Sequence, residues 1–518
     1  MKNENLNTEK IFNLVTIVFI TLKISIHLFA GHYELHRDEM LYFNMGSHPA
    51  WGYLTVPPVT GWLAAVIKEV FGYSFFGIRL LPALAGAVSF YLTARIVKLM
   101  NGGITALIIA LTTSLLLPGS LLLFSIFTPN AFEYLFWTLA ICLMLKLMIT
   151  ENEKLWIWIG ITLGFSFMTK YSVLFLIAGF FFAFLVSKHW KLLLSWWLLA
   201  GILAGALIIL PNIIWQYNHN WPVQFHFEEL KKTQLDNLNY SHFFSDFFSL
   251  TSVWILLIIA GFIFLLANKK QPHLQLPGIA VLLVYLLFIG TKGKAYYVSG
   301  TLPLLIAAGG CFAEKISRPK TVTIVVTTLL TIFSLISLPF VIPVFTFEKL
   351  EKYANNSFGQ ILAPFMRWEG GKVHPVSQVY ADMTGWQEMA DLAGKAFHQL
   401  TEEEKKRCTI FCERNYGYAG AIHFYGKKYN LPQPITYHES YIFWAPDSIP
   451  WGPAIYINYE PGGMKEIFVE VTEIGTVNDP YFREKGVKVF LCRNPRVDVP
   501  DIYKADINKE RERFTREN

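Results

Sequence analysis

The sequence predicts a polytopic α-helical membrane protein that carries a soluble α/β domain at its C-terminal end. Of the 518 residues, 53% are hydrophobic and only 16% are charged, whereas soluble domains average about 25% charged residues. The hydrophobic residues gather in long runs between residues 11 and 343, and residues 344–518 have the mixed composition of a soluble domain. We therefore expect a membrane domain over 1–343 and a soluble domain over 344–518.

The apolar runs have the length of membrane-spanning helices, which need about 20 predominantly apolar residues each. They number about eleven, and the first is expected to act as an uncleaved signal anchor, since it exceeds the length of a typical signal peptide core. The candidate spans are 11–31, 75–100, 103–123, 131–149, 155–170, 172–187, 192–212, 249–267, 275–290, 300–315 and 320–343.

Basic residues occur at every second connection between these spans. They are Lys2 and Lys10, Arg95 and Lys98, Lys154, Lys188 and Lys191, Lys269 and Lys270, and Lys315, Arg318 and Lys320. Because cytoplasmic loops are enriched in lysine and arginine, this alternation predicts a cytoplasmic N-terminus. An odd number of spans then places 344–518 and the long loops 32–74 and 213–248 on the extracytoplasmic side.

The first long loop contains a segment of a different kind. In residues 59–71 apolar side chains recur at helical spacing, but the segment is too short to span a bilayer. It is expected to lie in the membrane interface as an amphipathic helix, the alternative being a simple connector. Loop 213–248 is rich in Trp, Tyr, His and Phe, which predicts either an interfacial aromatic belt or a lid over lipid.

The C-terminal part alternates helices and strands, which is typical of a small α/β domain. The expected helices are 386–400 and 419–429, and the expected strands are 409–412, 455–457 and 487–491. Asp382 or Thr384 is expected to cap the first of these helices. Cys408, Cys412 and Cys492 leave a disulfide open if this domain faces an oxidising space.

Two adjacent carboxylates, Asp38 and Glu39, stand at the outer mouth of the first span. They can be ordinary solvated loop acids. Alternatively, repulsion between them raises the pKa of one carboxyl, which suits a general base near neutral pH. Asp38 is the preferred catalytic residue, with Glu39 as its partner. Aromatic side chains surround the pair, and we expect Tyr42, Trp51 and Tyr53 to contact the substrate.

Further polar residues fall on the same outer side. Asn130 and Glu133 share a helical face at the start of a span and can bind sugar hydroxyls, although a carboxylate there also stabilises a helix N-terminus. Cations on this side run against the orientation rule, and binding of an anionic lipid phosphate explains them; snorkelling is the alternative for Lys170. This basic and tyrosine set comprises Arg79, Lys170, Lys292, Lys294, Tyr296 and Tyr297.

The motifs require no particular cofactor. His32 and His36, four residues apart near Asp38, leave a divalent metal open. The sequence has no Walker A loop, dinucleotide-binding glycine motif or nucleophile elbow, so a nucleotide-sugar donor is unsupported. The net charge of +6 resides largely in the short basic loops, without the basic and aromatic stripe of a nucleic-acid-binding protein.

Several motifs together resemble the GT-C glycosyltransferases, and most closely the bacterial group related to protein O-mannosyltransferases and to lipid A aminoarabinose transferase. In the membrane part they are Asp38-Glu39 with Tyr42, Trp51-Gly52-Tyr53 with Pro57-Pro58, Asn130-Ala131-Phe132-Glu133, Thr169-Lys170-Tyr171, and Lys292-Gly293-Lys294 with Tyr296-Tyr297. In the C-terminal part they are Asp382-Met383-Thr384-Gly385-Trp386 and Asn415-Tyr416-Gly417 with Ala419-Gly420-Ala421.

This resemblance implies a multi-pass glycosyltransferase of the bacterial plasma membrane. Its donor would be a polyprenyl-phosphate-linked sugar, and its acceptor an envelope lipid, glycan or protein. In such families the first-loop aspartate is the proposed base, here Asp38, and one base without a covalent nucleophile favours inversion. Some relatives carry an aspartate in the second site, where this chain has Asn130 and Glu133.

Two other classes of protein remain open at the level of sequence. A transporter or flippase for a polyprenyl-linked sugar explains the membrane helices, but it predicts corresponding halves and polar groups near the bilayer midplane. An envelope assembly protein leaves Asp38 and the outer cations without a role.

Overall fold

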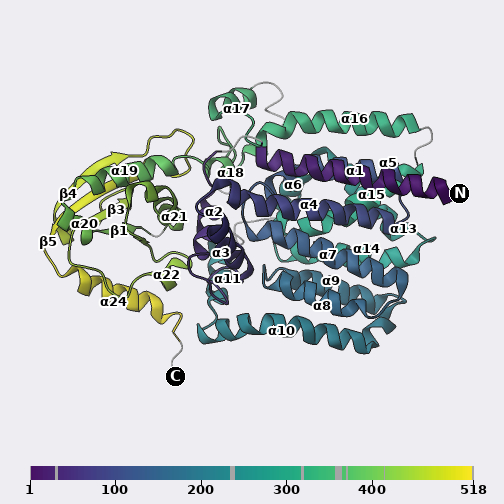
Figure 1. The fold of residues 1–518 in the computed structure, drawn as a ribbon, viewed down its shortest axis with the longest axis horizontal. Coiled ribbons are helices and arrows are strands. Elements are labelled where there is room, and N and C mark those ends of the chain that lie inside the picture. Colours follow the sequence, from purple (N-terminus) through teal and green to yellow (C-terminus); the bar gives the residue numbers. More distant parts are fainter. Residues whose placement is uncertain are drawn as a thin grey trace. The chain divides into compact units, whose positions relative to one another are not determined.

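The computed structural model describes residues 2–29, 33–233, 240–316, 320–355, 365–368, 372–413 and 415–515 (Figure 1). They form two compact units that interleave along the sequence. The helical unit comprises Met1–Gly31, Arg79–Ile213 and Phe227–Phe345, and the mixed unit comprises His32–Ile78, Ile214–His226 and Thr346–Asn518. Parts of both predicted long loops therefore fold with the C-terminal region rather than with the helices that flank them.

The helical unit is built from long apolar helices that run in roughly the same direction (Figure 1). They are α1 (Lys2–Phe29), α4 (Phe75–Leu99), α5 (Ile104–Leu116), α7 (Pro129–Thr150), α8 (Leu155–Phe167), α9 (Val173–Val186), α10 (Trp196–Asn218), α12 (Tyr240–Thr251), α13 (Ile255–Ala267), α14 (Gln275–Gly290), α15 (Leu302–Ile316) and α16 (Lys320–Ser337). Two further helices differ from these: α6 (Pro118–Leu123) is short, and α11 (Pro222–Thr233) is polar. The centre of the unit is α15, where every residue from Leu302 to Cys311 is buried.

Within the described residues, seven helices are long and apolar enough to cross a membrane. They are Asn7–Phe29, Phe75–Leu99, Pro129–Thr150, Trp196–Asn218, Tyr240–Ala267, Pro272–Gly290 and Ala295–Ile316. Four shorter apolar helices, Ile104–Leu116, Leu155–Phe167, Val173–Val186 and Ile324–Phe340, fall on the remaining predicted spans. Each predicted apolar segment is thus helical, while the exact number that crosses the bilayer stays a prediction.

Glycines bring two of these helices into close contact. Gly160 and Gly164 of α8 face Gly201 and Gly205 of α10, and a Cβ added to Gly160 would lie 2.0 Å from the carbonyl oxygen of Gly201. Both pairs have the four-residue spacing that lets membrane helices approach backbone to backbone. A larger side chain at Gly160 or Gly201 would force the two helices apart.

The mixed unit contains the predicted α/β domain. Its helices are α2 (Arg37–Met45), α3 (Val59–Phe71), α17 (Phe347–Ala354), α18 (Gln378–Ala381), α19 (Trp386–His398), α20 (Glu402–Lys406), α21 (Tyr416–Tyr425), α22 (Tyr441–Trp444), α23 (Met464–Ile467) and α24 (Val499–Glu512). Its strands are β1 (Thr409–Cys412), β2 (Pro434–Ile435), β3 (Ala454–Asn458), β4 (Phe468–Thr476) and β5 (Lys488–Pro495). Two of these strands were not predicted, because β2 is short and β4 is charged and largely exposed.

The strands form one sheet in the order β2-β1-β3-β5-β4, in which β2, β1 and β3 are parallel and β5 is antiparallel to β3 and β4. Helices α19 and α21 pack against one face. The other face is covered by α24, whose Tyr503 and Ile507 join the core with Tyr456 and Phe490. Cys408, Cys412 and Cys492 are buried free thiols, so the structure contains no disulfide among them.

Candidate active site

The stretch that carries Asp38 opens helix α2. His36 is the N-cap residue, its Nδ1 accepts the backbone N–H of Asp38 at 3.1 Å, and the Glu39 carboxylate accepts the backbone N–H of His36 at 2.9 Å. This reciprocal arrangement is a capping box, which satisfies two otherwise unpaired donors at the start of a helix. Glu39 is fully buried in this role, and the geometry therefore gives it a structural function.

Asp38 points instead toward side chains of the mixed unit. Its Oδ1 accepts a hydrogen bond of 2.6 Å from the Tyr416 hydroxyl and lies 3.7 Å from Nε of Arg37. The Arg37 guanidinium also stacks over the Tyr416 ring at 4.9 Å. About a third of the Asp38 side chain, 34%, is exposed, so the side chain remains partly accessible.

These neighbours set the ionisation state of Asp38. Burial raises the pKa of its carboxyl, but the charges of His36 and Arg37, the hydrogen bond from Tyr416 and the charge of Arg483 outweigh burial, and the pKa lies below its ordinary value. The expectation that repulsion within the acidic pair raises a pKa is wrong for Asp38, because cations surround it and Glu39 is turned into the helix cap. Asp38 is accordingly ionised at neutral pH.

A second acid, Asp382, contacts the residues that precede Asp38. Asp382 is 3% exposed and binds Nη1 of Arg483 at 3.0 Å, while its Oδ2 lies 3.8 Å from Nε2 of His36. Its backbone carbonyl accepts the N–H of Arg37 at 3.1 Å. Asp382 therefore orients both residues that precede Asp38, rather than capping the following helix as expected.

The predicted aromatic contacts have different environments. Tyr42 is half-buried on α2, and Trp51 is 52% exposed and packs edge-on against Trp62 at 5.1 Å. Tyr53 is 1% exposed, and its hydroxyl lies 3.1 Å from the carbonyl oxygens of Met45 and His48. Tyr53 therefore holds the turn between α2 and α3, whereas Trp51 is accessible to a ligand.

The helical unit brings a second set of predicted residues together. Nζ of Lys170 donates to Oδ1 of Asn130 at 2.7 Å and to Oε2 of Glu133 at 3.1 Å. The same ammonium lies 4.3 Å from the ring centre of Tyr297 and 5.1 Å from that of Tyr296. Glu133, which is 5% exposed on its side chain, also accepts a hydrogen bond from Ser172.

The three other predicted cations have different degrees of exposure. Arg79 is buried on α4. Lys292 is exposed, and with Lys294 it lines a shallow hollow that also includes His242 and Asp246.

For the divalent metal that the sequence leaves open, the described residues provide no set of ligands. His32 lies outside the described residues. His36 uses Nδ1 to accept the Asp38 N–H, and the described parts of the chain contain no group of three or more His, Cys, Asp or Glu side chains arranged to hold a metal ion.

Three residues around Asp38 were not predicted individually as functional: Tyr416, Arg483 and Arg37. Tyr416 and Asp382 lay within C-terminal motifs that carried the family resemblance, and that was the available signal. Nothing local marks Arg483, since its partner Asp382 is 101 residues away in the chain.

Comparisons with known proteins agree with the fold. The family model of dolichyl-phosphate-mannose-protein mannosyltransferases matches residues 55–215. Lipid A galacturonosyltransferase RgtD of Rhizobium johnstonii is 26% identical over 188 residues, which cover 35% of this chain and 38% of that protein. The alignment therefore spans well under half of that relative.

Solved structures extend the similarity to the whole chain. ArnT from Cupriavidus metallidurans in the apo state has a TM-score of 0.63 at 14% identity, covering 94% of this chain and 98% of ArnT. ArnT bound to undecaprenyl phosphate has a TM-score of 0.61 at 13% identity, covering 93% and 97%. The chain thus has the GT-C fold, as predicted, and the predicted resemblance to this group of membrane glycosyltransferases is confirmed.

Proposed function

We propose that this chain is a membrane glycosyltransferase that moves a sugar from a polyprenyl-phosphate donor to an extracytoplasmic acceptor at the bacterial plasma membrane. The observation that carries the proposal is the partly exposed Asp38 carboxylate, which Tyr416 and Arg37 hold in its ionised form, in a chain with the fold of ArnT. Because the relative RgtD is a lipid A galacturonosyltransferase, lipid A is the first acceptor to test.

In the proposed reaction a hydroxyl of the acceptor attacks the anomeric carbon of the donor sugar. Asp38 takes the hydroxyl proton as the new C–O bond forms, and the bond to the phosphate oxygen breaks with its electron pair, releasing polyprenyl phosphate. A depressed pKa makes Asp38 a weak base that is always ionised, so its proton transfer accompanies rather than precedes attack. This single displacement inverts the anomeric configuration.

Lys170 is proposed to hold the donor phosphate. An ammonium group has three donors, of which two are bound to Asn130 and Glu133, and the remaining donor can contact a phosphate oxygen. Positive charge fixed next to a leaving phosphate stabilises the charge that develops there. Glu133 and Asn130 then position the lysine, and Tyr296 and Tyr297 flank it.

The test uses the full-length protein in lipid nanodiscs with a sugar-charged polyprenyl phosphate and lipid A. Wild-type protein should release polyprenyl phosphate, Asp38→Asn should lose at least about 100-fold in kcat, and Asp501→Asn, an exposed carboxylate on α24, should retain activity. Full activity of Asp38→Asn contradicts the assignment of the base, and retention of anomeric configuration in the product contradicts single displacement.

The phosphate assignment is tested separately. Lys170→Met should raise the KM for the charged lipid about tenfold or more and leave the KM for the acceptor unchanged. An equal rise in both KM values would show that Lys170 acts only on the fold.

A further inference from the structure

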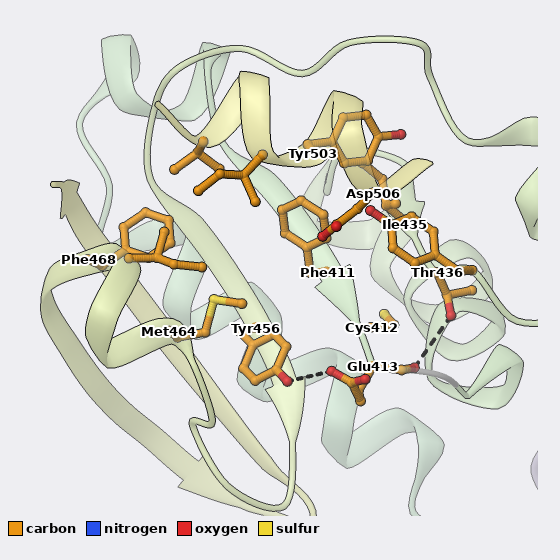
Figure 2. A pocket seen from close by; sticks show the side chains of 14 residues that line it. Phe411, Cys412, Glu413, Ile435, Thr436, Tyr456, Met464, Phe468, Tyr503 and Asp506 are labelled. Atoms are coloured by element: carbon orange, nitrogen blue, oxygen red, sulfur yellow. Dashed lines mark hydrogen bonds between the residues drawn. The ribbon is translucent and has the colours of Figure 1, made fainter. Parts of the chain in front are cut away.

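A cavity of about 270 Å³ lies in the mixed unit between the sheet and α24 (Figure 2). Its floor is apolar and aromatic, with Phe411, Ile435, Met464 and Phe468. Polar groups also line it, among them the carboxylates of Glu413 and Asp506. The volume is below the range of drug-sized sites and suits a ligand of about one sugar ring.

The cavity extends to the carboxyl ends of β1 and β2, which is where open α/β sheets bind ligands. Strand β1 lies between β2 and β3 in the sheet, and all three strands are parallel. The chain therefore passes from β1 to β2 on one side of β1 and then returns to β3 on its other side. Ligands bind at such a reversal of strand order, outside the carboxyl ends of the strands. Glu413 follows the last residue of β1, and its carboxylate accepts a hydrogen bond of 2.5 Å from Tyr456 of β3, visible as a dashed line in Figure 2.

The charge of the lining restricts the ligand. Two carboxylates line the cavity, and its described lining includes no Lys, Arg or His. A phosphate or a uronic acid would therefore meet only like charge, which costs free energy in a partly buried site. Carboxylate oxygens beside an apolar ring-sized floor match a neutral sugar, whose hydroxyl groups donate hydrogen bonds and whose C–H face packs on aromatic rings.

The loop beneath this cavity also leads to Asp38. Glu413 faces the cavity, and Tyr416, three residues further on, donates its hydroxyl to Asp38 at 2.6 Å. Between them Asn415 caps α21 by accepting the N–H of Gly417 at 2.8 Å. One βα connection therefore carries a residue of the cavity and the residue that holds the carboxylate.

We propose that this cavity binds a neutral sugar residue of the acceptor. The role of the bound sugar as part of the acceptor rests on the proposed glycosyltransferase function. Binding of the sugar itself can be measured without transfer. Bound there, a neutral sugar would tether a glycan-bearing acceptor to the βα connection that positions Tyr416 against Asp38.

Binding is tested on the full-length protein in nanodiscs by saturation-transfer-difference NMR. The probes are methyl β-glucoside and methyl N-acetyl-β-glucosaminide as neutral sugars, glucuronate and glucose 6-phosphate as anions, and glucosamine as a cation. Neutral sugars should give a signal at millimolar concentration and the anions none. The signal should fall at least fivefold in Asp506→Asn and disappear in Ile502→Trp, which fills the cavity from a 40% exposed position; Asp501→Asn, on the same helix, should leave it unchanged.

Three outcomes would overturn the proposal. They are absence of signal from both neutral sugars, equal signal in Ile502→Trp, or stronger binding of glucosamine than of the neutral sugars, which would make the cavity an ammonium site. Sugar binding without any transfer activity would refute the glycosyltransferase function and leave the sugar site standing. Transfer activity with an unchanged acceptor KM in Asp506→Asn would refute the role of the cavity in acceptor binding and leave the glycosyltransferase function standing.

Discussion

At the scale of single residues, Asp38 and Glu39 are chemically similar neighbours with different environments. Glu39 is turned inward and closes a capping box with His36, whereas Asp38 is turned toward Tyr416 and solvent. Helix geometry separates them, because consecutive side chains on a helix point about 100° apart. The division predicts different consequences for substitution of each acid.

Glu39→Ala should lower stability with little effect on catalysis. Loss of the capping interaction costs about 1 kcal/mol, and Glu39→Gln, whose amide oxygen can accept the same His36 N–H, should lose much less. The measurement is the thermal midpoint of the full chain in detergent together with kcat of the folded fraction. A large fall in kcat for Glu39→Gln at unchanged midpoint would give Glu39 a catalytic role after all.

Tyr416→Phe should move the pH dependence of the reaction. The Tyr416 hydroxyl lowers the pKa of Asp38 by donating to its ionised form, so its removal raises that pKa. The acidic limb of the kcat/KM profile should shift to higher pH by about one unit, the effect of a hydrogen bond of about 1.4 kcal/mol to a charged group. Activity near neutral pH, where Asp38 stays ionised, should change much less. Tyr459→Phe, which removes a bond to Glu484 instead, is the control and should leave the profile in place.

At the scale of elements, α19 begins in an unusual way. Gly385 occupies the N-cap with φ of 81° and offers no side chain, while Thr384 donates its hydroxyl to Asp479. The carboxylate of Glu34, 352 positions away from Trp386, accepts the N–H groups of Trp386 and Gln387 at 2.7 and 3.1 Å. The cap predicted at Asp382 or Thr384 is therefore wrong, because a distant acid takes its place.

This remote cap predicts a pH dependence of stability. Burial raises the pKa of Glu34 from 4.5 to about 7, so the folded state holds a proton that the unfolded state releases. The resulting stabilisation is complete below pH 4.5 and is lost as pH rises through 7, by at most about 3 kcal/mol at about 1.4 kcal/mol per pKa unit. Glu34→Gln should flatten the thermal midpoint between pH 5 and 8.

Glu388→Gln provides the matched control for this dependence. It neutralises another acid in the first turn of α19, which binds the N–H of Asn478, and should retain the slope with pH. An unaltered slope in Glu34→Gln would assign the pH dependence to another group.

At the scale of the whole molecule, the helices were predictable and the environment of Asp38 was not. Apolar length alone identifies a spanning helix, and the spacing in 59–71 gave α3 with its observed bounds. The contact between Asp38 and Tyr416 joins residues 378 positions apart, and only the tertiary fold creates it. The contact between Glu133 and Lys170 was foreseeable in part, because each is a charged side chain at the end of an apolar run, where a charge requires a partner.

Orientation across the membrane is the last property that the chain predicts for itself. Alternation of basic loops predicts that Lys269 is cytoplasmic and that the C-terminal domain is extracytoplasmic, and the glycosyltransferase proposal requires the same orientation. Lys465→Cys, exposed on α23, should react with a membrane-impermeant maleimide in intact spheroplasts, and Lys269→Cys should react only after permeabilisation. The native thiols give little background, since Cys311, Cys408, Cys412 and Cys492 are buried and Cys142 is partly so. The opposite labelling pattern would place Asp38 on the cytoplasmic side, where a nucleotide-linked sugar becomes accessible and the requirement for a lipid-linked donor falls away.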